Sequence, residues 1–161
     1  PTPLAALLVG KLAARLAVGA AQMCVLFVVG WLAFDVSLGP EPWALALPTA
    51  GIVFAGTAFG LVVAGVTTSR EAVLPVGSIA ILTMAAVGGC WWPIDLEPDW
   101  MRTAALAFPT TWAMEAYNDL MIRRETAAAV ITATAVLFAY GVAYLALGLV
   151  LFRRRVLRDA S

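Results

Sequence analysis

The side chains that could do chemistry gather in one stretch of this chain, residues 88–124. Glu115, Asp119 and Arg123 follow one another at intervals of four residues, a spacing that places them on one face of a helix. The structural interpretation of this spacing is an ion pair on the helix surface. A second interpretation, in which Glu115 takes part in function, stays open at this point.

Several classes of chemistry are excluded by residues that the chain lacks. It has no histidine and only two cysteines, Cys24 and Cys90, which lie far apart in or near apolar runs. This removes Ser/His and Cys/His dyads, a disulfide framework and most metal sites. A hydrolase would need paired carboxylates, which the apolar runs lack. We therefore expect no catalytic residue, no metal and no cofactor bound by this chain.

The composition is that of an integral membrane protein. Hydrophobic residues make up 63% of the chain and charged residues 12%, and the mean hydropathy is +0.94. Soluble domains have about 45–50% apolar and about 25% charged residues. The formal net charge is zero, so charge indicates no nucleic-acid partner. We predict an all-α, polytopic membrane protein with a single transmembrane domain over residues 1–161.

Four apolar runs are long enough to cross a bilayer as helices. About 20 residues, each rising about 1.5 Å, cross the roughly 30 Å hydrocarbon layer. Short segments that carry charges, glycine or proline separate the runs. We predict spans at about residues 12–34, 43–68, 72–92 and 127–152.

Small residues leave one face of the second predicted span without large side chains. Gly56 and Gly60 are spaced four apart, a pattern that lets another helix approach closely. A glycine-rich membrane helix with no specific partner would look the same. Both interpretations of Gly56 and Gly60 therefore stay open.

The segment of residues 93–126 is predicted to form two short external interfacial helices, between the last two spans, and not a fifth span. The residues that interrupt it are Asp99, Arg102, Pro109, Glu115 and Asp119. Each charge at mid-membrane would cost a few kcal/mol, yet the segment is too apolar for a free loop. We expect the first helix to begin near Pro98 and the second after Pro109, with Thr110 or Thr111 as its N-cap.

The basic residues are distributed asymmetrically about the predicted spans. Seven of the ten fall on the side that holds both chain ends: Lys11, Arg15, Arg70, Arg153, Arg154, Arg155 and Arg158. The opposite side holds Arg102, Arg123 and Arg124 with eight acidic residues. Because positive residues are retained in the cytoplasm, we expect both ends inside and residues 93–126 outside.

Prolines and aromatic residues follow one another in a distinctive order. Pro93, Pro98 and Trp100 form a Pro-x-x-x-x-Pro-x-Trp pattern after a glycine pair and an aromatic residue, and residues 109–113 read Pro-Thr-Thr-Trp-Ala before an acid. The start of the chain, residues 7–12, reads Leu-Leu-Val-Gly-Lys-Leu. This order resembles the permease subunits of type-2 ATP-binding-cassette (ABC) exporters over nearly all of the chain.

The resemblance implies a chain that represents the last four of six spans, with two spans and most of a cytosolic coupling helix upstream of Pro1. It implies a cytosolic ABC ATPase that binds the ATP, and a second permease subunit in a homo- or heterodimer. Membrane lipids are the remaining partners expected. The protein would be a multi-pass component of the plasma (inner) membrane, of a bacterial kind.

The resemblance also suggests which residues would act. Candidates for an external gate are Pro93, Pro98, Trp100, Pro109, Trp112, Glu115, Tyr117 and Asp119. Tyr140 and Tyr144 share a face of the last span and are candidates for lining a path. The simpler interpretation makes the tryptophans interfacial anchors and the tyrosines part of the packing.

The function expected is that of a permease subunit without its own ATPase site, which forms the path for an amphipathic or lipid-like substrate. None of the polar side chains in the predicted spans is a carboxylate or a base, so a proton- or sodium-coupled carrier would lack its coupling site. The alternative is a membrane scaffold or assembly protein that uses its glycine faces to hold partner helices.

Overall fold

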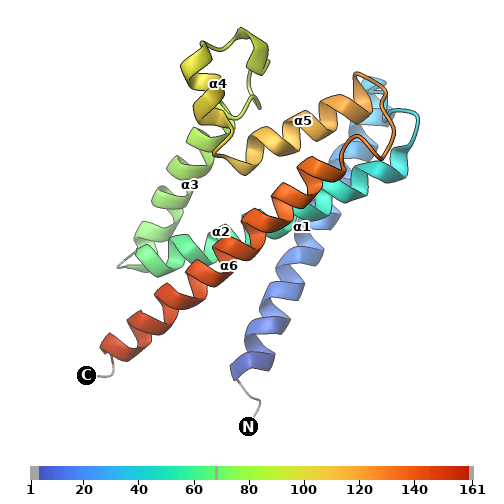
Figure 1. The fold of residues 1–161 in the computed structure, drawn as a ribbon. Helices are drawn as coiled ribbons and strands as arrows, with labels where there is room; N and C mark the ends of the chain where they lie inside the picture. The colour runs from blue at the N-terminus through green and yellow to red at the C-terminus, as the bar shows by residue number, and fades with distance from the viewer. Residues whose placement is uncertain (1–3, 68, 160–161) are drawn as a thin grey trace.

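The structure is a computed structural model that describes residues 4–67 and 69–159, where every regular element is helical (Figure 1). The elements are α1 (Leu4–Phe34), the short 3-10 helix η1 (Pro42–Leu45), α2 (Ala46–Val66), α3 (Arg70–Val87), the 3-10 helix η2 (Ile94–Leu96), α4 (Asp99–Ala105), α5 (Pro109–Met121) and α6 (Ile131–Asp159). The predicted all-helical class is confirmed.

Three helices are long and apolar enough to cross a membrane within the described residues: Gly10–Phe34, Pro42–Val66 and Ile131–Leu151. Two of them differ from the predicted boundaries, and the second ends at Val66, before the predicted residue 68. Residues 43–45 belong to η1 and not to a regular α-helix, and residues 127–130 form turns before α6 begins. The arginines at positions 153, 154, 155 and 158 lie on the last turns of α6, and their side chains lie outside the described part of the structure.

The predicted third span of residues 72–92 was too long, because α3 ends at Val87. Gly88 caps the helix and Gly89 adopts a φ of +78°, a left-handed conformation that glycine takes without steric cost. The amide of Cys90 then donates to the Ala85 carbonyl at 3.0 Å, which closes a Schellman motif. The apolar helix Glu71–Val87 is shorter than the other three, and the 18 residues of α3 rise only about 27 Å.

Helices α2 and α6 pack along much of their length and form the centre of the molecule. Glycines on each helix lie against a large side chain of the other. A Cβ added at Gly51 would come within 2.8 Å of Leu137 Cβ, and one added at Gly148 within 2.8 Å of Leu61 Cβ. The two backbones therefore approach more closely than larger residues would permit.

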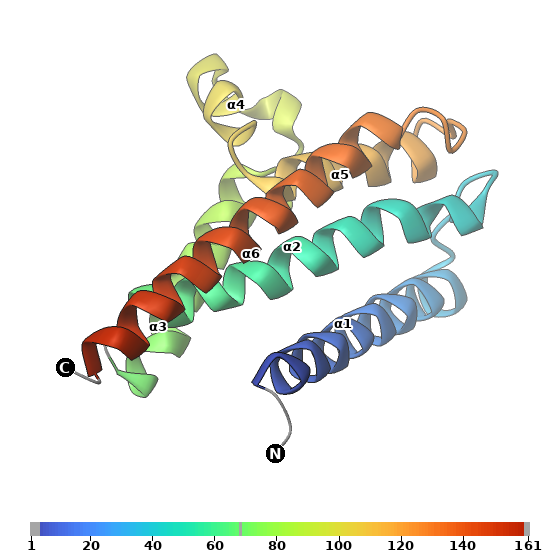
Figure 2. The same ribbon diagram turned by 60° about the horizontal axis from the view of Figure 1, so that its bottom comes forward.

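Helix α1 runs beside α2 but is set apart from it over most of its length (Figure 2). None of the apolar span in α1 is buried inside the molecule, as expected for a helix that faces lipid or another subunit. Phe27 of α1 forms an edge-to-face pair with Tyr117, with ring centroids 5.6 Å apart. This contact joins the end of α1 to α5.

The apolar core lies at the end of the bundle where η1, α5 and the start of α6 meet. Its buried members are Ala44, Leu45, Ala116, Leu120, Val130 and Ala133. The loop before η1 closes over this core, with Gly39 at a φ of +78° against the Leu120 carbonyl. Any side chain at Gly39 would collide with that carbonyl, so glycine is required there. The core thus fixes α5 against α2 and α6.

Candidate functional site

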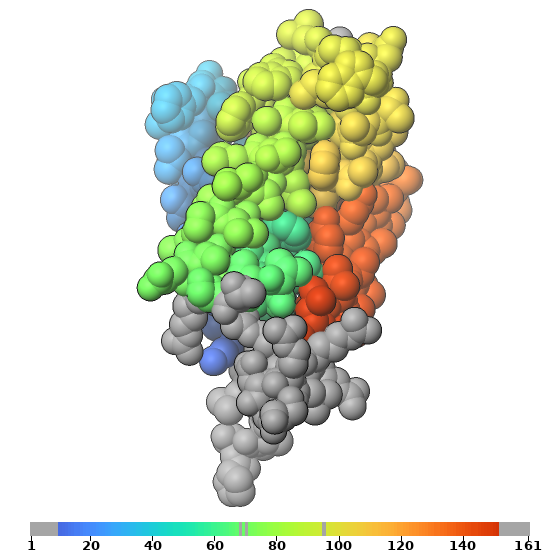
Figure 3. All heavy atoms as spheres, turned by 90° about the vertical axis from the view of Figure 1, so that its left-hand side faces the viewer, coloured from blue at the N-terminus to red at the C-terminus, as the bar shows by residue number. Residues whose placement is uncertain are grey.

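The turn after α3, helix α4 and the first turn of α5 form a small module at the end of α3 (Figure 3), whereas the rest of α5 packs on α6 and α2. As predicted, α4 begins after Pro98, and α5 begins at Pro109. The predicted threonine cap of α5 was wrong, because Phe108 is the N-cap and no side chain caps the helix. Pro109 occupies the first helical position, where its missing N–H costs nothing and its fixed φ favours the helix.

The two threonines instead join α5 to its neighbours. Thr110 Oγ1 donates to the Met84 carbonyl at 2.6 Å, and Gly88 leaves the space that the Thr110 side chain fills. Thr111 Oγ1 donates to the Ala105 carbonyl at 2.6 Å. The end of α3 and the end of α4 are therefore both fixed to the first turn of α5.

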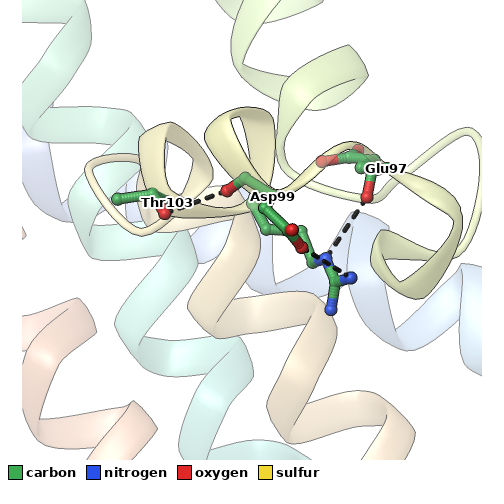
Figure 4. A network of polar contacts seen from close by, with 4 residues as sticks. Glu97, Asp99 and Thr103 are labelled. Carbon is green, nitrogen blue, oxygen red and sulfur yellow. Dashed lines mark hydrogen bonds and ion pairs between the residues drawn. The ribbon is translucent and has the colours of Figure 1, made fainter.

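A polar network holds the first turn of α4 (Figure 4). Arg102 Nε donates to the Glu97 carbonyl at 3.2 Å, and Arg102 Nη2 lies 3.1 Å from Asp99 Oδ1. Thr103 Oγ1 donates to the Asp99 carbonyl at 2.9 Å. The two contacts of Arg102 hold its guanidinium beside the first turn of α4.

Glu97 is a buried carboxylate that sequence reasoning missed. Only 4% of the residue is exposed, and Oε1 accepts a hydrogen bond from Trp92 Nε1 at 2.9 Å. Oε2 is buried without a hydrogen-bond partner among the described residues. An acid in a loop is usually solvated, so its position before Pro98 gave no sign of burial.

One backbone carbonyl brings a gate candidate and a path candidate together. Trp112 Nε1 and Tyr140 Oη donate to the Leu106 carbonyl at 3.0 Å and 3.3 Å. The ring of Tyr144 lies 5.8 Å from that of Tyr140 and 5.3 Å from that of Phe59, measured between centroids. Tyr140 thus connects α6 to the loop between α4 and α5, whereas Tyr144 packs between α6 and α2.

Tyr117 faces α2 and α1. Its hydroxyl lies 3.0 Å from Thr49 Oγ1, and its ring meets Phe27 edge to face. Burial raises the pKa of the Tyr117 phenol above its ordinary value. Tyr117 is therefore a neutral hydrogen-bonding group at physiological pH.

The remaining gate candidates lie in different environments. Asp119 and Arg123 form the ion pair that their spacing indicated. Pro109 is buried, whereas Pro93, Pro98 and Trp100 are exposed, with 73% of Trp100 accessible. Glu115 is exposed on the same helix as Asp119. The eight candidates therefore do not form one cluster.

A cavity of about 310 Å³ lies where the turn after α3 meets α4 and α5. Pro93 and Glu115 are the gate candidates that line it. The other polar side chains in its wall are Arg102, Thr103, Thr111, Asn118 and Arg123. Apolar side chains, among them Ile94, Leu106 and Met114, complete the wall. The cavity wall of this module therefore combines polar and apolar side chains.

Comparison with known proteins identifies the family. Residues 1–150 match the family model for the ABC-2 family transporter protein. The chain belongs to this family. A similar protein is the linearmycin resistance permease protein LnrN of Bacillus subtilis (strain 168), 27% identical over 145 residues. The match covers 84% of this chain and 38% of that relative, and no solved structure gave a significant match.

The resemblance to type-2 ABC permeases is thereby confirmed. The chain is a multi-pass membrane protein of the ABC-2 transporter family, as the family match and its long apolar helices show. Because the chain spans 38% of the length of LnrN, it corresponds to a part of that permease.

A second, wider cavity of the ABC-2 chain lies between α1 and α2. It is an open groove of about 1,090 Å³ with a mainly apolar wall, to which Arg15, Gln22 and Thr57 add polar groups. Gly56 and Gly60 also line this groove. Among the described residues, no atom lies within 4 Å of a Cβ built at Gly56, and one built at Gly60 meets only the end of the Arg15 side chain, at 4.0 Å. Neither glycine therefore packs closely against a helix backbone of its own chain. The role of the pair in packing between subunits stays a prediction.

Proposed function

We propose that this chain is the membrane-spanning part of an ATP-driven exporter and forms a path for an amphipathic or lipid-like substrate. The observation that carries the proposal is the match to the ABC-2 family over residues 1–150. The name of the relative LnrN, a resistance permease, agrees with a role in moving a harmful compound.

The energy for transport would come from a partner. Residues 16–34, 46–66 and 131–151 contain no carboxylate, lysine, arginine or histidine, so these helices offer no charged site for coupling to protons or sodium ions. We propose that a cytosolic ABC ATPase binds and hydrolyses ATP and that a second permease subunit completes the path. Nucleotide-driven closure would then shift the permease between two conformations of different affinity for the substrate.

Helix α3 would act as the additional span. Its side chains are widely exposed, with 78% of Leu74 and 67% of Ile79 accessible, which suits a helix surrounded by lipid. Its rise of about 27 Å is close to the roughly 30 Å hydrocarbon thickness. Both ends would then be cytoplasmic and α4 and α5 external, in agreement with the distribution of arginine and lysine.

The groove between α1 and α2 is a candidate for the substrate path. Its apolar wall suits the hydrocarbon part of an amphiphile, and Gln22 and Thr57 suit a polar part. Glu115, Trp112 and the other gate candidates would close the external end through α5. Tyr140 would transmit a movement of α6 to this gate, because its hydroxyl contacts the loop before α5.

Reconstitution of the full-length protein tests the proposal. We expect the permease to co-purify with an ABC ATPase and to move an amphiphile across liposomes only with ATP. Linearmycin is one probe, chosen from the name of the relative. An ATPase variant that binds but does not hydrolyse ATP is the control. Assembly without ATP-dependent movement of any tested amphiphile would favour the scaffold function.

A further inference from the structure

The cavity at the end of α3 has a wall that is more basic than acidic. Arg102 reaches it from α4 and Arg123 from the segment after α5, whereas Glu115 is the acidic residue among the described side chains that line it. The acidic partners of the two arginines, Asp99 and Asp119, are not part of the wall. The described side chains of the wall therefore carry a formal excess of positive charge.

The hydrogen-bond donors of the cavity are chiefly cationic. The hydroxyls of Thr103 and Thr111 donate to the carbonyls of Asp99 and Ala105, so their protons are not available to a ligand. The Arg102 guanidinium and the Asn118 amide are further side-chain donors in the wall, and Arg123 adds a second guanidinium, which also pairs with Asp119. Guanidinium groups form strong, charge-assisted hydrogen bonds with phosphate and carboxylate oxygens.

The position of Arg102 suits such a ligand. Its Nε is held by the Glu97 carbonyl, so the guanidinium is oriented before a ligand binds. Its ion pair with Asp99 is exposed, with 98% of the Asp99 side chain accessible. Exposed pairs of this kind contribute little free energy, so an incoming oxyanion can compete for the guanidinium.

The residues around the cavity indicate where the ligand comes from. Trp91, Leu96 and Trp100 are 60%, 76% and 73% exposed. Exposed tryptophans beside the end of a membrane helix are typical of the interfacial layer, where lipid headgroups lie. A volume of about 310 Å³ suits a headgroup and not a whole lipid.

We propose that this cavity binds the phosphate headgroup of an anionic phospholipid. Arg102 and Arg123 bind the phosphate oxygens, and Asn118 donates to the same group. Ile94, Leu106 and Met114 contact the glycerol and the first carbons of the chains. Glu115, at an exposed position in the wall, accepts from a hydroxyl group of the headgroup. This lipid site does not depend on which substrate is transported or on the membrane orientation proposed above.

Lipid retention tests this site. The full-length protein is purified from nanodiscs of phosphatidylcholine with and without phosphatidylglycerol, and bound lipid is measured by native mass spectrometry. We expect Arg102→Gln to lower retained phosphatidylglycerol about fivefold to tenfold, and the double change with Arg123→Gln to lower it further. Arg124→Gln is the matched control, because Arg124 neighbours Arg123 but does not line the cavity.

Further measurements keep the result interpretable. Arg102→Lys keeps the charge but loses the planar pair of donors, so it should retain an intermediate amount of lipid. Equal retention in the wild type and in all arginine variants would overturn the proposal. Displacement of the lipid by millimolar inorganic phosphate would also overturn it, since the site would then hold a free anion. ATP-dependent transport is assayed separately, so failure of this site leaves the proposed export function intact.

Discussion

The hydroxyl groups of Thr49 and Tyr117 lie 3.0 Å apart and join α2 to α5 across the apolar core. Thr49 Oγ1 also lies 2.6 Å from the Leu45 carbonyl, which can only accept, so the single Thr49 proton is used there. Tyr117 must therefore donate to Thr49. The direction of this bond decides which substitution at the pair costs more.

Removal of the acceptor should destabilise the protein more than removal of the donor. Thr49→Val leaves the Tyr117 hydroxyl without its partner in a largely buried site, and we expect a loss of about 1–3 kcal/mol. Tyr117→Phe removes the donor and leaves Thr49 bonded to Leu45, so about 0.5–1.5 kcal/mol should be lost. Denaturant unfolding of the full-length protein in detergent measures both.

The double variant provides the control for this pair. In the Tyr117→Phe background, no Tyr117 hydroxyl is present to lose its acceptor. Thr49→Val should therefore lower the free energy of unfolding less in this background than it does alone. Strictly additive losses would mean that the two hydroxyls do not interact.

A second connection joins the loop before η1 to the loop before α6. Glu41 Oε2 accepts a hydrogen bond from the Ala127 amide at 2.8 Å. Glu41→Ala should destabilise the protein by about 1.5–3 kcal/mol, because an amide bonded to a charged group loses its acceptor. Glu41→Gln keeps a carbonyl oxygen and should cost about half as much. If Glu41→Gln costs nothing, the charge of Glu41 adds nothing to this bond.

Two glycines on α2 should respond differently to the same substitution. At Gly51 a new side chain meets Leu137 at 2.8 Å, whereas at Gly56 it meets nothing within 4 Å. Gly51→Leu should therefore disrupt the α2–α6 packing and lower folded yield several-fold. Gly56→Leu should leave the folded yield unchanged, as size-exclusion chromatography of both variants would reveal.

The same pair of variants tests the predicted role of Gly56 and Gly60 in assembly. If another subunit packs on this face, Gly56→Leu should weaken dimer formation without loss of the folded monomer. Unchanged assembly would make the face an ordinary lining of the groove between α1 and α2.

The fold was predictable where a single local feature of the sequence, such as an apolar run or a proline, decides the structure. Uninterrupted apolar runs indicated three of the long helices, and Pro98 and Pro109 marked the starts of α4 and α5. The sequence pattern places the end of α3 too late, because apolar Trp91 and Trp92 extend the hydrophobic run past the glycine pair. A left-handed Gly89 ends the helix irrespective of the hydrophobicity that follows.

The site was less predictable because it depends on contacts between distant residues. The four-residue spacing of Asp119 and Arg123 is local, and their ion pair follows from it. Thr110 instead contacts Met84, 26 residues earlier, and no local pattern indicates that bond. Burial of Glu97 and the cavity beside Arg102 likewise arise from the way α4 folds back toward α5.

Cys90 gives a test of membrane orientation. It lies in the exposed turn after α3, whereas Cys24 lies within α1, a predicted span. In intact cells that make the full-length protein, a membrane-impermeant maleimide should label Cys90 several-fold more than Cys24. Cys90→Ser should abolish most of the signal and Cys24→Ser should not. Labelling of Cys90 only after the cells are opened would place α4 and α5 in the cytoplasm.

The rate of this labelling should depend on pH in a defined direction. Partial burial raises the pKa of the Cys90 thiol above its ordinary value, because desolvation disfavours the charged thiolate. The thiolate is the reactive form, so at neutral pH Cys90 should react more slowly than an unhindered model thiol. The deficit should narrow as the pH rises past about 8.5, the ordinary thiol value. A deficit that stays constant over this range would indicate steric shielding of Cys90 instead of a raised pKa.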